Sequence, residues 1–400
     1  MTVRLRYGDK DVSWGLPVSA INLQDILDRM NVQNGREIEF MFSNYDMVDL
    51  PVNILDKWKK ADIYKLNLFA ERFERLEKWQ KAGLKSLLIR YPDSTIDDMI
   101  TMTYGIDCVP AYPGSTYEEL GEIAVNNEML PELYGCSNKI VELLDMKKVG
   151  KEFEELYEGV LLDGYLCIPS SYDESDTDIH ITIEVPDKRY FRVLVSPSAT
   201  TTDQAQWFNL PEDIRRLREY SAEWNSTPEQ MYITEVESAL PNITDAAYYE
   251  ANWVDDMIAL SEQMTCLSKA QIVKLKAVME AENIQTFSEA REAIGSLNEY
   301  DFDSMVQDES QYGKSYACRV FSTKFDWSIL ENCDMDDFGK QVLARKHGAM
   351  TEYGILSGRG EKLYTILVAE PEVMEEAEEE TEDESETEDE SEGISMGGMT

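Results

Sequence analysis

The stretch ITEVESALPNITDAAYYEANWVDDM, residues 233–257, joins a strand-like segment, a Leu-Pro corner and the start of a helix in one acidic run. It lies inside a longer window, residues 219–268, that contains ten carboxylates and no Lys or Arg. A folded surface normally mixes both signs of charge, because like charges repel one another and oppose the compact state. The apolar residues that recur at helical spacing are Trp253, Met257, Leu260, Met264 and Leu267. This stripe predicts a helix that is buried on one side and turns Asp255, Asp256 and Glu262 toward solvent.

The whole chain shares this acidity. It has 400 residues, of which 79 are acidic and 37 basic, and a formal net charge of -42. Disordered acidic chains lack the apolar and aromatic residues that a core needs, whereas this chain is 43% hydrophobic and 10% aromatic. The composition therefore predicts a folded protein, and the length predicts two or three domains.

The cysteines and the N-terminal residues favour an intracellular protein. The six cysteines form no Cys-x-x-Cys pair, and MTVRLRYGDK has no apolar segment typical of a secretion signal. No window approaches the roughly twenty apolar residues of a membrane span. We therefore expect a soluble cytoplasmic protein without a membrane contact. Because its charge repels phosphates, we expect a basic protein as partner and no direct contact with nucleic acid.

The C-terminal segment, residues 370–400, differs from the rest of the chain. Fifteen acidic residues and no basic one lie within residues 370–392, without apolar periodicity. Such a charge block predicts a disordered acidic tail. Residues 1–369 still carry a net charge of -27, so the part that we expect to fold is acidic in its own right.

Sequence landmarks recur in the same order in the two halves of the chain. A Trp followed by a Leu-Pro opens each copy, in WGLP at residues 14–17 and in WFNLP at residues 207–211. An apolar segment then runs into acidic residues and a second Leu-Pro, which ends at Pro51 in the first copy and at Pro241 in the second.

An Asp-Met element with a Gly-Lys closes each copy. It is DMKKVGK at residues 145–151 and DMDDFGK at residues 334–340, and in each copy another glycine follows nine residues after the first. The second Leu-Pro lies 99 residues before Gly150 and 98 residues before Gly339. Spacing that agrees this closely predicts duplicated structural units. We assign residues 1–167 to the first unit and residues 178–369 to the second.

Short polar patterns predict the helix starts. A Ser or Thr followed three residues later by an acidic or amide residue has the spacing of a capping box. This spacing occurs at Ser268 with Gln271, Thr286 with Glu289, Ser94 with Asp97, and Ser115 with Glu118. Strand-like stretches are short and lie toward the start of each unit, as in HITIEV and YFRVLV within residues 180–195. Each unit is therefore predicted to be α+β, with acidic helices after short strands.

The ordered landmarks of the second unit resemble the ArdA-type antirestriction proteins. The resemblance rests on Trp207, Phe208, Leu210 and Pro211, residues 231–241, Phe338 and Gly339, and Tyr353 with Gly354. The first unit matches more loosely. The resemblance implies an elongated, curved protein of small domains that imitates the charge of duplex DNA and occupies the DNA groove of a type I restriction-modification enzyme. It also implies a bacterial host cell, and an anti-defence role for a mobile genetic element or phage. Most members of this family have one such unit, so a tandem pair is a departure.

We expect the carboxylates of the windows without basic residues to form the surface that binds the partner. Besides residues 219–268, these windows are residues 93–132, with nine carboxylates, and residues 292–309, with six. A single acidic helix is usually an ordinary solvated face, but the repetition favours mimicry. Helices with a carboxylate on each turn repeat at about 5.4 Å, and several side by side approach the one charge per about 1.7 Å of a duplex. The predicted surface residues are Asp97, Asp98, Glu118, Glu119, Glu122, Glu235, Glu237, Asp245, Glu250, Asp255, Asp256, Glu262, Asp301, Asp303, Asp336 and Asp337.

One segment has the opposite charge balance. Residues 57–90 contain ten basic and four acidic residues. We expect a helix here, stabilised by ion pairs between side chains four residues apart. The expected pairs are Glu71 with Arg75, Glu74 with Lys78, and Glu77 with Lys81. The segment is either an ordinary salt-bridged face or a contact for the acidic second unit.

Enzymatic interpretations find little support in the sequence. His180 and His347 are the only histidines, and neither lies in a nucleophile motif. Residues 173–178 and 301–309 are acidic clusters without the central glycine and twelve-residue spacing of a calcium loop. We expect no catalytic residue, cofactor or metal site. Two alternatives to the DNA mimic stay open, an acidic module for another basic nucleic-acid-binding or defence protein, and a metal-dependent hydrolase with clustered carboxylates.

The duplication predicts how the acidic windows are arranged. The resemblance implies that relatives with a single unit form dimers. We therefore expect either a monomer whose two units form a pseudo-symmetric pair or a homodimer. Residues 1–170 carry -10 and residues 171–369 carry -17, so we expect the second unit to contribute more to binding.

Overall fold

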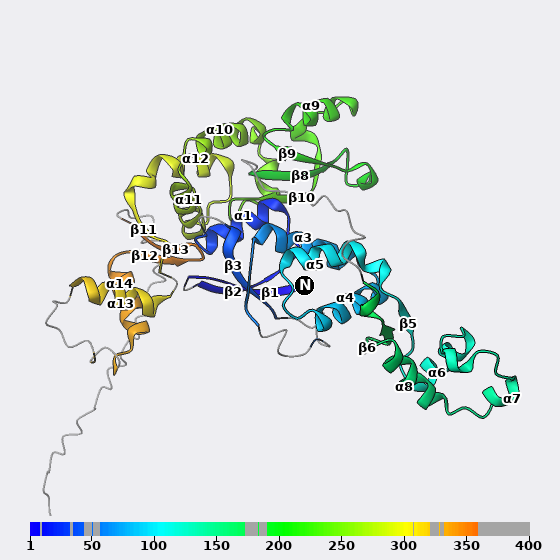
Figure 1. Ribbon diagram of the computed structural model, residues 1–400. Helices are drawn as coiled ribbons and strands as arrows, with labels where there is room; N and C mark the ends of the chain where they lie inside the picture. The colour runs from blue at the N-terminus through cyan, green and yellow to red at the C-terminus, as the bar shows by residue number, and fades with distance from the viewer. Residues whose placement is uncertain are drawn as a thin grey trace, which may run out of the picture.

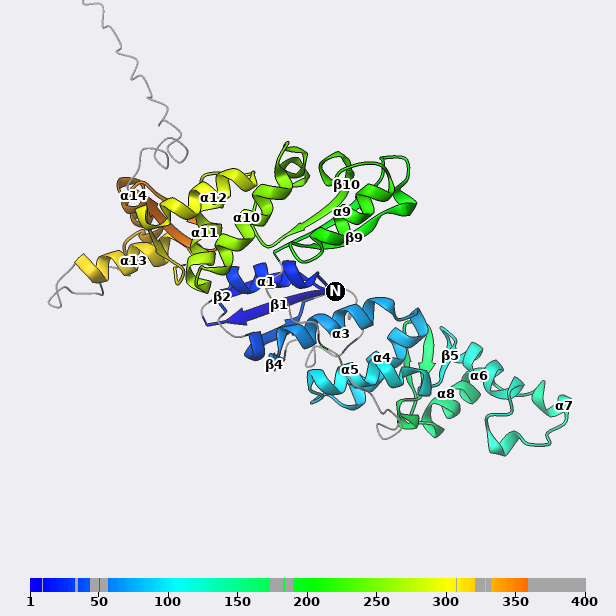
Figure 2. The ribbon, with the colours of Figure 1, turned by 90° about the horizontal axis from the view of Figure 1, so that it is seen from above.

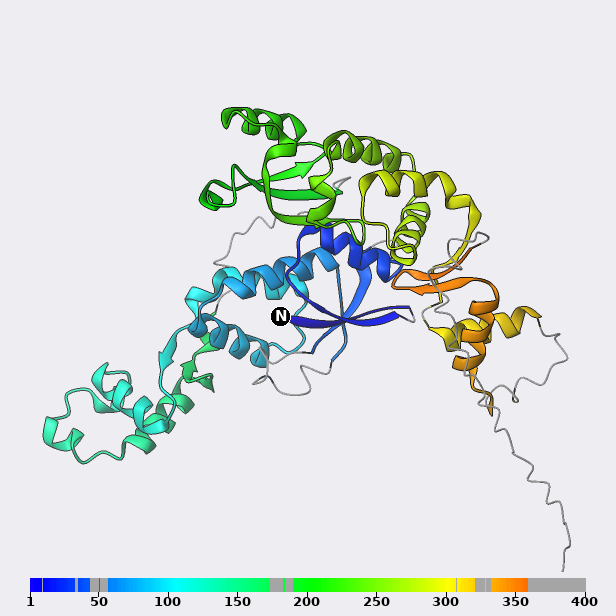
Figure 3. The same ribbon diagram turned by 180° about the vertical axis from the view of Figure 1, so that it is seen from behind.

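The computed structural model describes residues 1–8, 10–32, 35–43, 50, 57–172, 183, 190–306, 308–320, 328 and 332–358. The described strands pair in antiparallel sheets and are interleaved with helices, so the structure is α+β, as predicted. The expectation that strands precede the helices of each unit is wrong in part, because strands within residues 160–167 and 348–358 follow the last α-helix of each half. The predicted tail and most of HITIEV lie outside the described residues. Among the helices that are described, none has the length and apolar character needed to cross a membrane. Figures 1, 2 and 3 show two small helix pairs at opposite ends of the molecule. One pair is α6 (Tyr117–Asn126) with α8 (Met146–Leu156), and the other is α13 (Glu309–Val320) with α14 (Met335–Arg345).

A four-stranded sheet begins the chain, with the order β2-β1-β3-β4. Its strands are β1 (Thr2–Tyr7), β2 (Lys10–Gly15), β3 (Ile38–Phe42) and β4 (Lys59–Ala61). Val3 and Leu5 of β1 are fully buried, while Arg4 and Arg6 alternate with them and pair with carboxylates on the other face. The helices of this region are α1 (Ala20–Arg29), α3 (Ile63–Arg75), α4 (Lys78–Arg90) and α5 (Ile96–Gly105).

The basic segment is not the single helix that we expected. It contains β4 and then two helices, because Leu76 leaves the helical conformation with ψ 140° and Glu77 caps the next helix. Of the expected pairs, Glu71 with Arg75 forms. The other two pairs do not form within the described residues, since Glu74 and Lys78 lie on opposite sides of the break and Glu77 is a capping residue.

The first of the two small helix pairs follows this region. It consists of β5 (Ala111–Pro113), α6 (Tyr117–Asn126), α7 (Asn138–Val141), α8 (Met146–Leu156), β6 (Val160–Leu162) and β7 (Tyr165–Cys167), with sheet order β5-β7-β6. Asp145 of the DMKKVGK element accepts a hydrogen bond from the Lys148 N–H at the start of α8. A Cβ on Gly150 would lie 2.0 Å from the Tyr117 carbonyl oxygen, so this glycine allows α6 and α8 to touch through their backbones.

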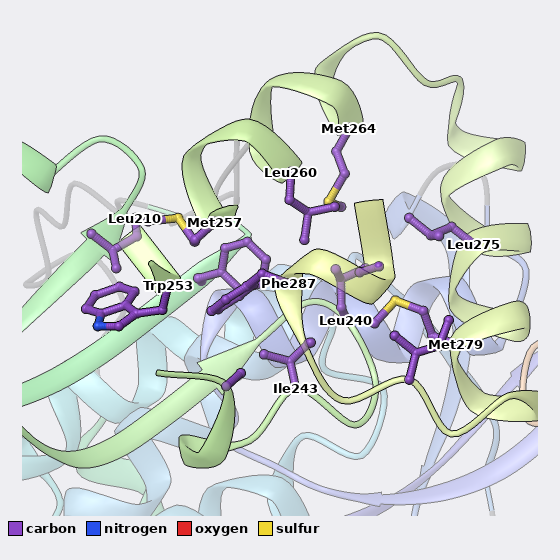
Figure 4. Close-up of a cluster of buried hydrophobic side chains, with 14 of the residues drawn as sticks. Leu210, Leu240, Ile243, Trp253, Met257, Leu260, Met264, Leu275, Met279 and Phe287 are labelled. Atoms are coloured by element: carbon purple, nitrogen blue, oxygen red, sulfur yellow. The ribbon is translucent and has the colours of Figure 1, made fainter. Parts of the chain in front are cut away.

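The second half of the chain begins with a three-stranded sheet and continues with helices. Its elements are β8 (Phe191–Ser196), β9 (Gln206–Leu210), α9 (Ile214–Glu223), β10 (Tyr232–Ser238), α10 (Trp253–Thr265), α11 (Lys269–Ala281) and α12 (Phe287–Ser296), with sheet order β10-β8-β9. Four residues of the predicted stripe, Trp253, Met257, Leu260 and Met264, are fully buried on α10. Figure 4 shows these side chains with Phe287 of α12 in the shared core. The fifth residue of the stripe, Leu267, lies beyond the end of the helix and is half-buried.

The last described elements form the second small helix pair. They are β11 (Tyr300–Asp303), α13 (Glu309–Val320), α14 (Met335–Arg345), β12 (Gly348–Thr351) and β13 (Gly354–Gly358), with sheet order β11-β13-β12. Asp334 caps α14 by accepting from the Asp337 N–H. A Cβ on Gly339 would lie 1.8 Å from the Glu309 carbonyl oxygen, so α13 and α14 also meet at a glycine.

Two of the four predicted capping boxes are confirmed, at Ser268 with Gln271 and at Thr286 with Glu289. The other two predictions are wrong by one residue, since the boxes are Thr95 with Asp98 and Thr116 with Glu119. Ser94 is buried and its hydroxyl donates to the Tyr91 carbonyl instead. Ser115 precedes the cap, and its N–H donates to the Glu119 carboxylate.

Candidate acidic interaction surface

Strand β10 presents its two predicted carboxylates in different ways. The register with β8 shifts between Ile233 and Glu235, as at a β-bulge, and Glu235 is exposed. Glu237 is half-buried, with an oxygen 3.6 Å from a guanidinium nitrogen of Arg192 on β8. That guanidinium also stacks over Trp207. Glu235 is therefore open to a partner, while Glu237 is partly neutralised within the fold.

Helix α10 carries three of the predicted carboxylates. Asp255 and Glu262 are exposed and seven residues apart, so they lie about 10 Å apart along one side of the helix. Asp256 is half-buried, and its carboxylate is 2.6 Å from the Arg291 guanidinium on α12. Arg218 of α9 approaches Asp255 to 4.0 Å, at the limit of an ion pair. Glu262 makes no ion pair with any described residue.

The segment between β10 and α10 adds two more carboxylates. Asp245 is exposed at the start of the 3₁₀ helix η9 (Asp245–Tyr249), and Glu250 follows it, partly exposed. Neither carboxylate forms an ion pair with the described part of the chain. The apolar residues around them, Ala247 and Tyr248, are buried, which fixes the backbone that carries both carboxylates.

Most predicted carboxylates of the first half are already used within the fold. Asp97 pairs with Lys65 of α3, 2.7 Å away, and Glu118 approaches Lys147 of α8 to 3.8 Å. Asp98 and Glu119 accept hydrogen bonds as members of the two capping boxes. Glu122 is exposed, and no described residue forms an ion pair with it.

The predicted carboxylates near the C-terminal helix pair divide in the same way. Asp301 on β11 is exposed, whereas Asp303 accepts a hydrogen bond from the Met305 N–H. Asp336 pairs with Lys340 at 2.6 Å, and this hydrogen bond raises the pKa of Lys340. Asp337 accepts from the Gln341 amide.

The structure therefore separates the sixteen predicted residues into two groups. Ten of them take part in ion pairs or hydrogen bonds inside the fold. The other six, which we call the open carboxylates, have no ion pair with the described residues and cap no helix. They are Glu122, Glu235, Asp245, Glu250, Glu262 and Asp301.

In the folded protein, basic side chains from other segments lie beside the window without basic residues, residues 219–268. Arg192, Arg218 and Arg291 lie before or after residues 219–268, yet each reaches a carboxylate of that window. Reasoning along the sequence also missed Lys276, which lies 1% exposed on α11. A lysine inside the apolar run from Leu275 to Met279 is the signal that could have revealed it.

Two further observations bear on the chemistry of the molecule. The described residues contain no group of three or more His, Cys, Asp or Glu side chains placed to hold a metal ion. Comparisons of the chain with protein-family models, with curated proteins and with solved structures found no match. Function is therefore inferred from the residues of the acidic surface.

Proposed function

We propose that this protein is a DNA-mimicking inhibitor, without catalytic activity of its own, that occupies the DNA-binding groove of a type I restriction-modification enzyme. The observation that carries the proposal is the position of the open carboxylates. Five of the six belong to residues 235–301 of the second half, on β10, in and directly after η9, on α10 and on β11. A groove lined with Lys and Arg can bind such carboxylates as it binds phosphates.

The charge balance of the surface also supports the proposal. Arginines of the second half neutralise the half-buried Glu237 and Asp256, while the exposed Glu235, Asp245 and Glu262 have no ion pair with a described residue. Long-range attraction to a basic groove depends on this remaining charge, and it guides the encounter between the proteins.

Two tandem ArdA-like units, residues 1–167 and 178–369, are part of the proposal. The orders β5-β7-β6 and β11-β13-β12 are the same when the strands are matched by their place in each half. In both halves an Asp caps the second helix of the pair, and a glycine on that helix, Gly150 or Gly339, contacts the backbone of the first. These correspondences support the interpretation of the sequence landmarks as a duplication.

The contact between the halves argues against a pseudo-symmetric pair. Helix α1 of the first half contacts β10 and α11 of the second, and these are not equivalent elements. A two-fold arrangement would bring the same surface of each half together. We therefore propose that the acidic surfaces of the two units follow one another in series along the molecule.

The proposal is tested by competition with DNA. A type I restriction-modification enzyme is titrated with the protein in the presence of labelled duplex, and the affinity of the triple variant Glu235→Gln, Asp245→Asn, Glu262→Gln is compared with that of the unaltered chain. We expect the protein and DNA to exclude each other, and the variant to bind at least about tenfold more weakly, if each contact contributes about 0.5 kcal/mol or more.

A matched control removes the same number of charges elsewhere. Glu37, Glu74 and Glu212 are exposed and have no ion pair with a described residue, so their change to Gln should leave competition nearly unaltered. Simultaneous binding of DNA and protein would reject mimicry and favour the alternative, an acidic module for another basic protein. Equal effects of the two triple variants would show that only net charge matters.

A further inference from the structure

A buried group of charges joins the two halves of the chain. The Lys276 ammonium on α11 donates to Asp25 Oδ1 at 2.9 Å and to Asp28 Oδ2 at 2.7 Å, both on α1. The side chains of Lys276 and Asp28 are 1% and 3% exposed. Burial of a charge costs free energy unless the charge is paired. The ammonium on α11 and the carboxylates on α1 pair with each other only when the two halves are in contact.

Further side chains complete this group, which we call the inter-half cluster. The Tyr353 hydroxyl donates to Asp25 Oδ1 at 2.7 Å, and Arg29 donates to the other Asp25 oxygen at 2.7 Å. Arg29 also pairs with Glu352 at the turn between β12 and β13. The cluster is Asp25, Asp28 and Arg29 from the first half, with Lys276, Glu352 and Tyr353 from the second.

The cluster stabilises the ionised form of Asp25. Burial acts to raise the pKa of this carboxyl, but the charges of Lys276 and Arg29 and the hydrogen bond from Tyr353 outweigh burial and hold the pKa below its ordinary value. An ionised Asp25 and a charged Lys276 therefore attract each other across the contact at neutral pH.

A comparison with the first half shows what is specific to this contact. Lys85 occupies the same place in α4 as Lys276 in α11, seven residues after the first residue of the helix, and it is also buried. Its ammonium is 2.7 Å from Asp163, in the hairpin turn between β6 and β7 of the same half. In the second half the hairpin turn has Tyr353 beside Gly354, where the first half has Asp163 beside Gly164. The carboxylates for Lys276 come instead from α1 of the other half.

We propose that the inter-half cluster is a positioning site, which holds the two halves in one fixed arrangement and so sets where the open carboxylates of the second half lie relative to the first. Both halves are negative, with -10 on residues 1–170 and -17 on residues 171–369, so they repel each other elsewhere. In the cluster, opposite charges of the two halves meet, which offsets this repulsion.

The basic residues of α11 are engaged at or near this contact. Lys269 donates to the Val32 carbonyl, and Lys274 donates to the Tyr300 carbonyl. Burial lowers the pKa of both lysines. Together with Lys276, all three lysines of the helix are bound to groups of this chain. None of these three lysines is therefore left as an unpaired cation beside the open carboxylates, a consequence that matters only if the proposed function holds.

The positioning site is tested with Lys276→Met in the full chain, since Met keeps most of the apolar length of Lys and removes the charge. We expect a larger radius of gyration in small-angle scattering, and separate unfolding transitions for the two halves where the unaltered chain has one. Lys85→Met is the matched control, because its partner Asp163 lies in the same half, and it should destabilise the first half without enlarging the molecule.

Several outcomes would overturn the proposal. An unchanged radius of gyration for Lys276→Met would do so, and so would an equal expansion in Lys85→Met. Lys276→Arg keeps the cation and should restore the compact arrangement, so a failure of this rescue also counts against it. If Lys276→Met does not fold by circular dichroism, Asp28→Asn provides the same scattering comparison.

The scattering result does not depend on the proposed function, because no partner protein is present. Inhibition assays with the same variants then distinguish the proposal of DNA mimicry from the proposed positioning role of the inter-half cluster. Expansion with reduced inhibition supports both. Expansion with full inhibition leaves the mimic intact and rejects the role of the cluster in positioning its surface. Full loss of competition in the triple variant with intact compactness supports the mimic independently of the cluster.

Discussion

Arg291 on α12 lies 2.6 Å from the carboxylate of Asp256 on α10, although no basic residue occurs anywhere in residues 219–268. A segment without Lys or Arg is thus placed beside an arginine when α12 packs against α10. Within this window the half-buried Glu237 and Asp256 pair with arginines from outside it, whereas the exposed Glu235, Asp245 and Glu262 have no ion pair with a described residue. Reversal of Asp256 would therefore break a structural contact as well as remove a charge.

Salt is expected to weaken the complex with the target. If carboxylates replace phosphates, several screened ion contacts contribute to affinity, so the dissociation constant should rise steeply between low and moderate ionic strength. The slope should be shallower than that of DNA for the same target, because a protein lacks the condensed counterions of a duplex. Titrations from about 50 to 200 mM salt measure both slopes. An affinity that is flat over this range contradicts mimicry.

Deletion of residues 370–400 is expected to leave folding intact and to slow association. The segment has no apolar periodicity to bury, but its charge can attract a basic partner at long range. Surface plasmon resonance should show a lower on-rate with a nearly unchanged off-rate. Complete loss of inhibition would mean that the tail is the principal binding element, which contradicts the assignment of binding to the open carboxylates.

Alanine at the helix-pair glycines is expected to be strongly destabilising. A Cβ at Gly150 or Gly339 would overlap a backbone carbonyl oxygen at 2.0 or 1.8 Å, and a backbone atom cannot move aside as a side chain can. We expect losses of about 3 kcal/mol or more in the free energy of unfolding, measured by urea denaturation. Gly295→Ala is the control, because nothing lies within 4 Å of its Cβ position on α12, and it should stabilise by about 0.5–1 kcal/mol.

Two neighbouring substitutions test which residue caps the N-terminus of α6. Thr116→Ala removes the side-chain oxygen that accepts from the Glu119 N–H and should cost about 1 kcal/mol of stability. Ser115→Ala leaves this hydrogen bond in place, so its effect should stay within about 0.5 kcal/mol. The reverse order of the two effects would place the cap at Ser115, as the sequence pattern suggested.

Acid is expected to weaken the contact between the halves through Asp25. The folded-state pKa of this carboxyl is depressed, so its contribution is present above the unfolded-state pKa of about 3.9 and is lost as pH falls through the folded-state value. The stability difference between the unaltered chain and Asp25→Asn should therefore be largest near neutral pH and shrink below about pH 4. Glu37→Gln, at an exposed position outside the cluster, is the control in the same measurements.

Local patterns in the sequence predicted local structure well. The four buried residues of the α10 stripe and the caps of α11 and α12 depend on neighbouring residues, and they are where the periodicity placed them. The DMKKVGK and DMDDFGK elements were recognised as a repeat, but their role was not, because the close contact of Gly150 with α6 depends on residues far away in the sequence.

Features that depend on distant contacts were not predicted. Residues 57–90 were expected to form one helix, since their charges suit a helix and nothing in the pattern marks the break at Leu76. Six of the sixteen predicted surface carboxylates are open, and the other ten could only be recognised once the side chains that face them were known. The inter-half cluster escaped prediction for the same reason.

The order of synthesis gives the inter-half cluster a further consequence. Asp28 and Lys276 are 248 residues apart, and at about 5–20 residues per second the ribosome needs about 12–50 s to travel between them. During that time α1 can complete the core of the first half, but Asp25 and Asp28 lack the ammonium of Lys276. If the first half folds during synthesis, as domains generally do, it folds without the contact that later fixes its place.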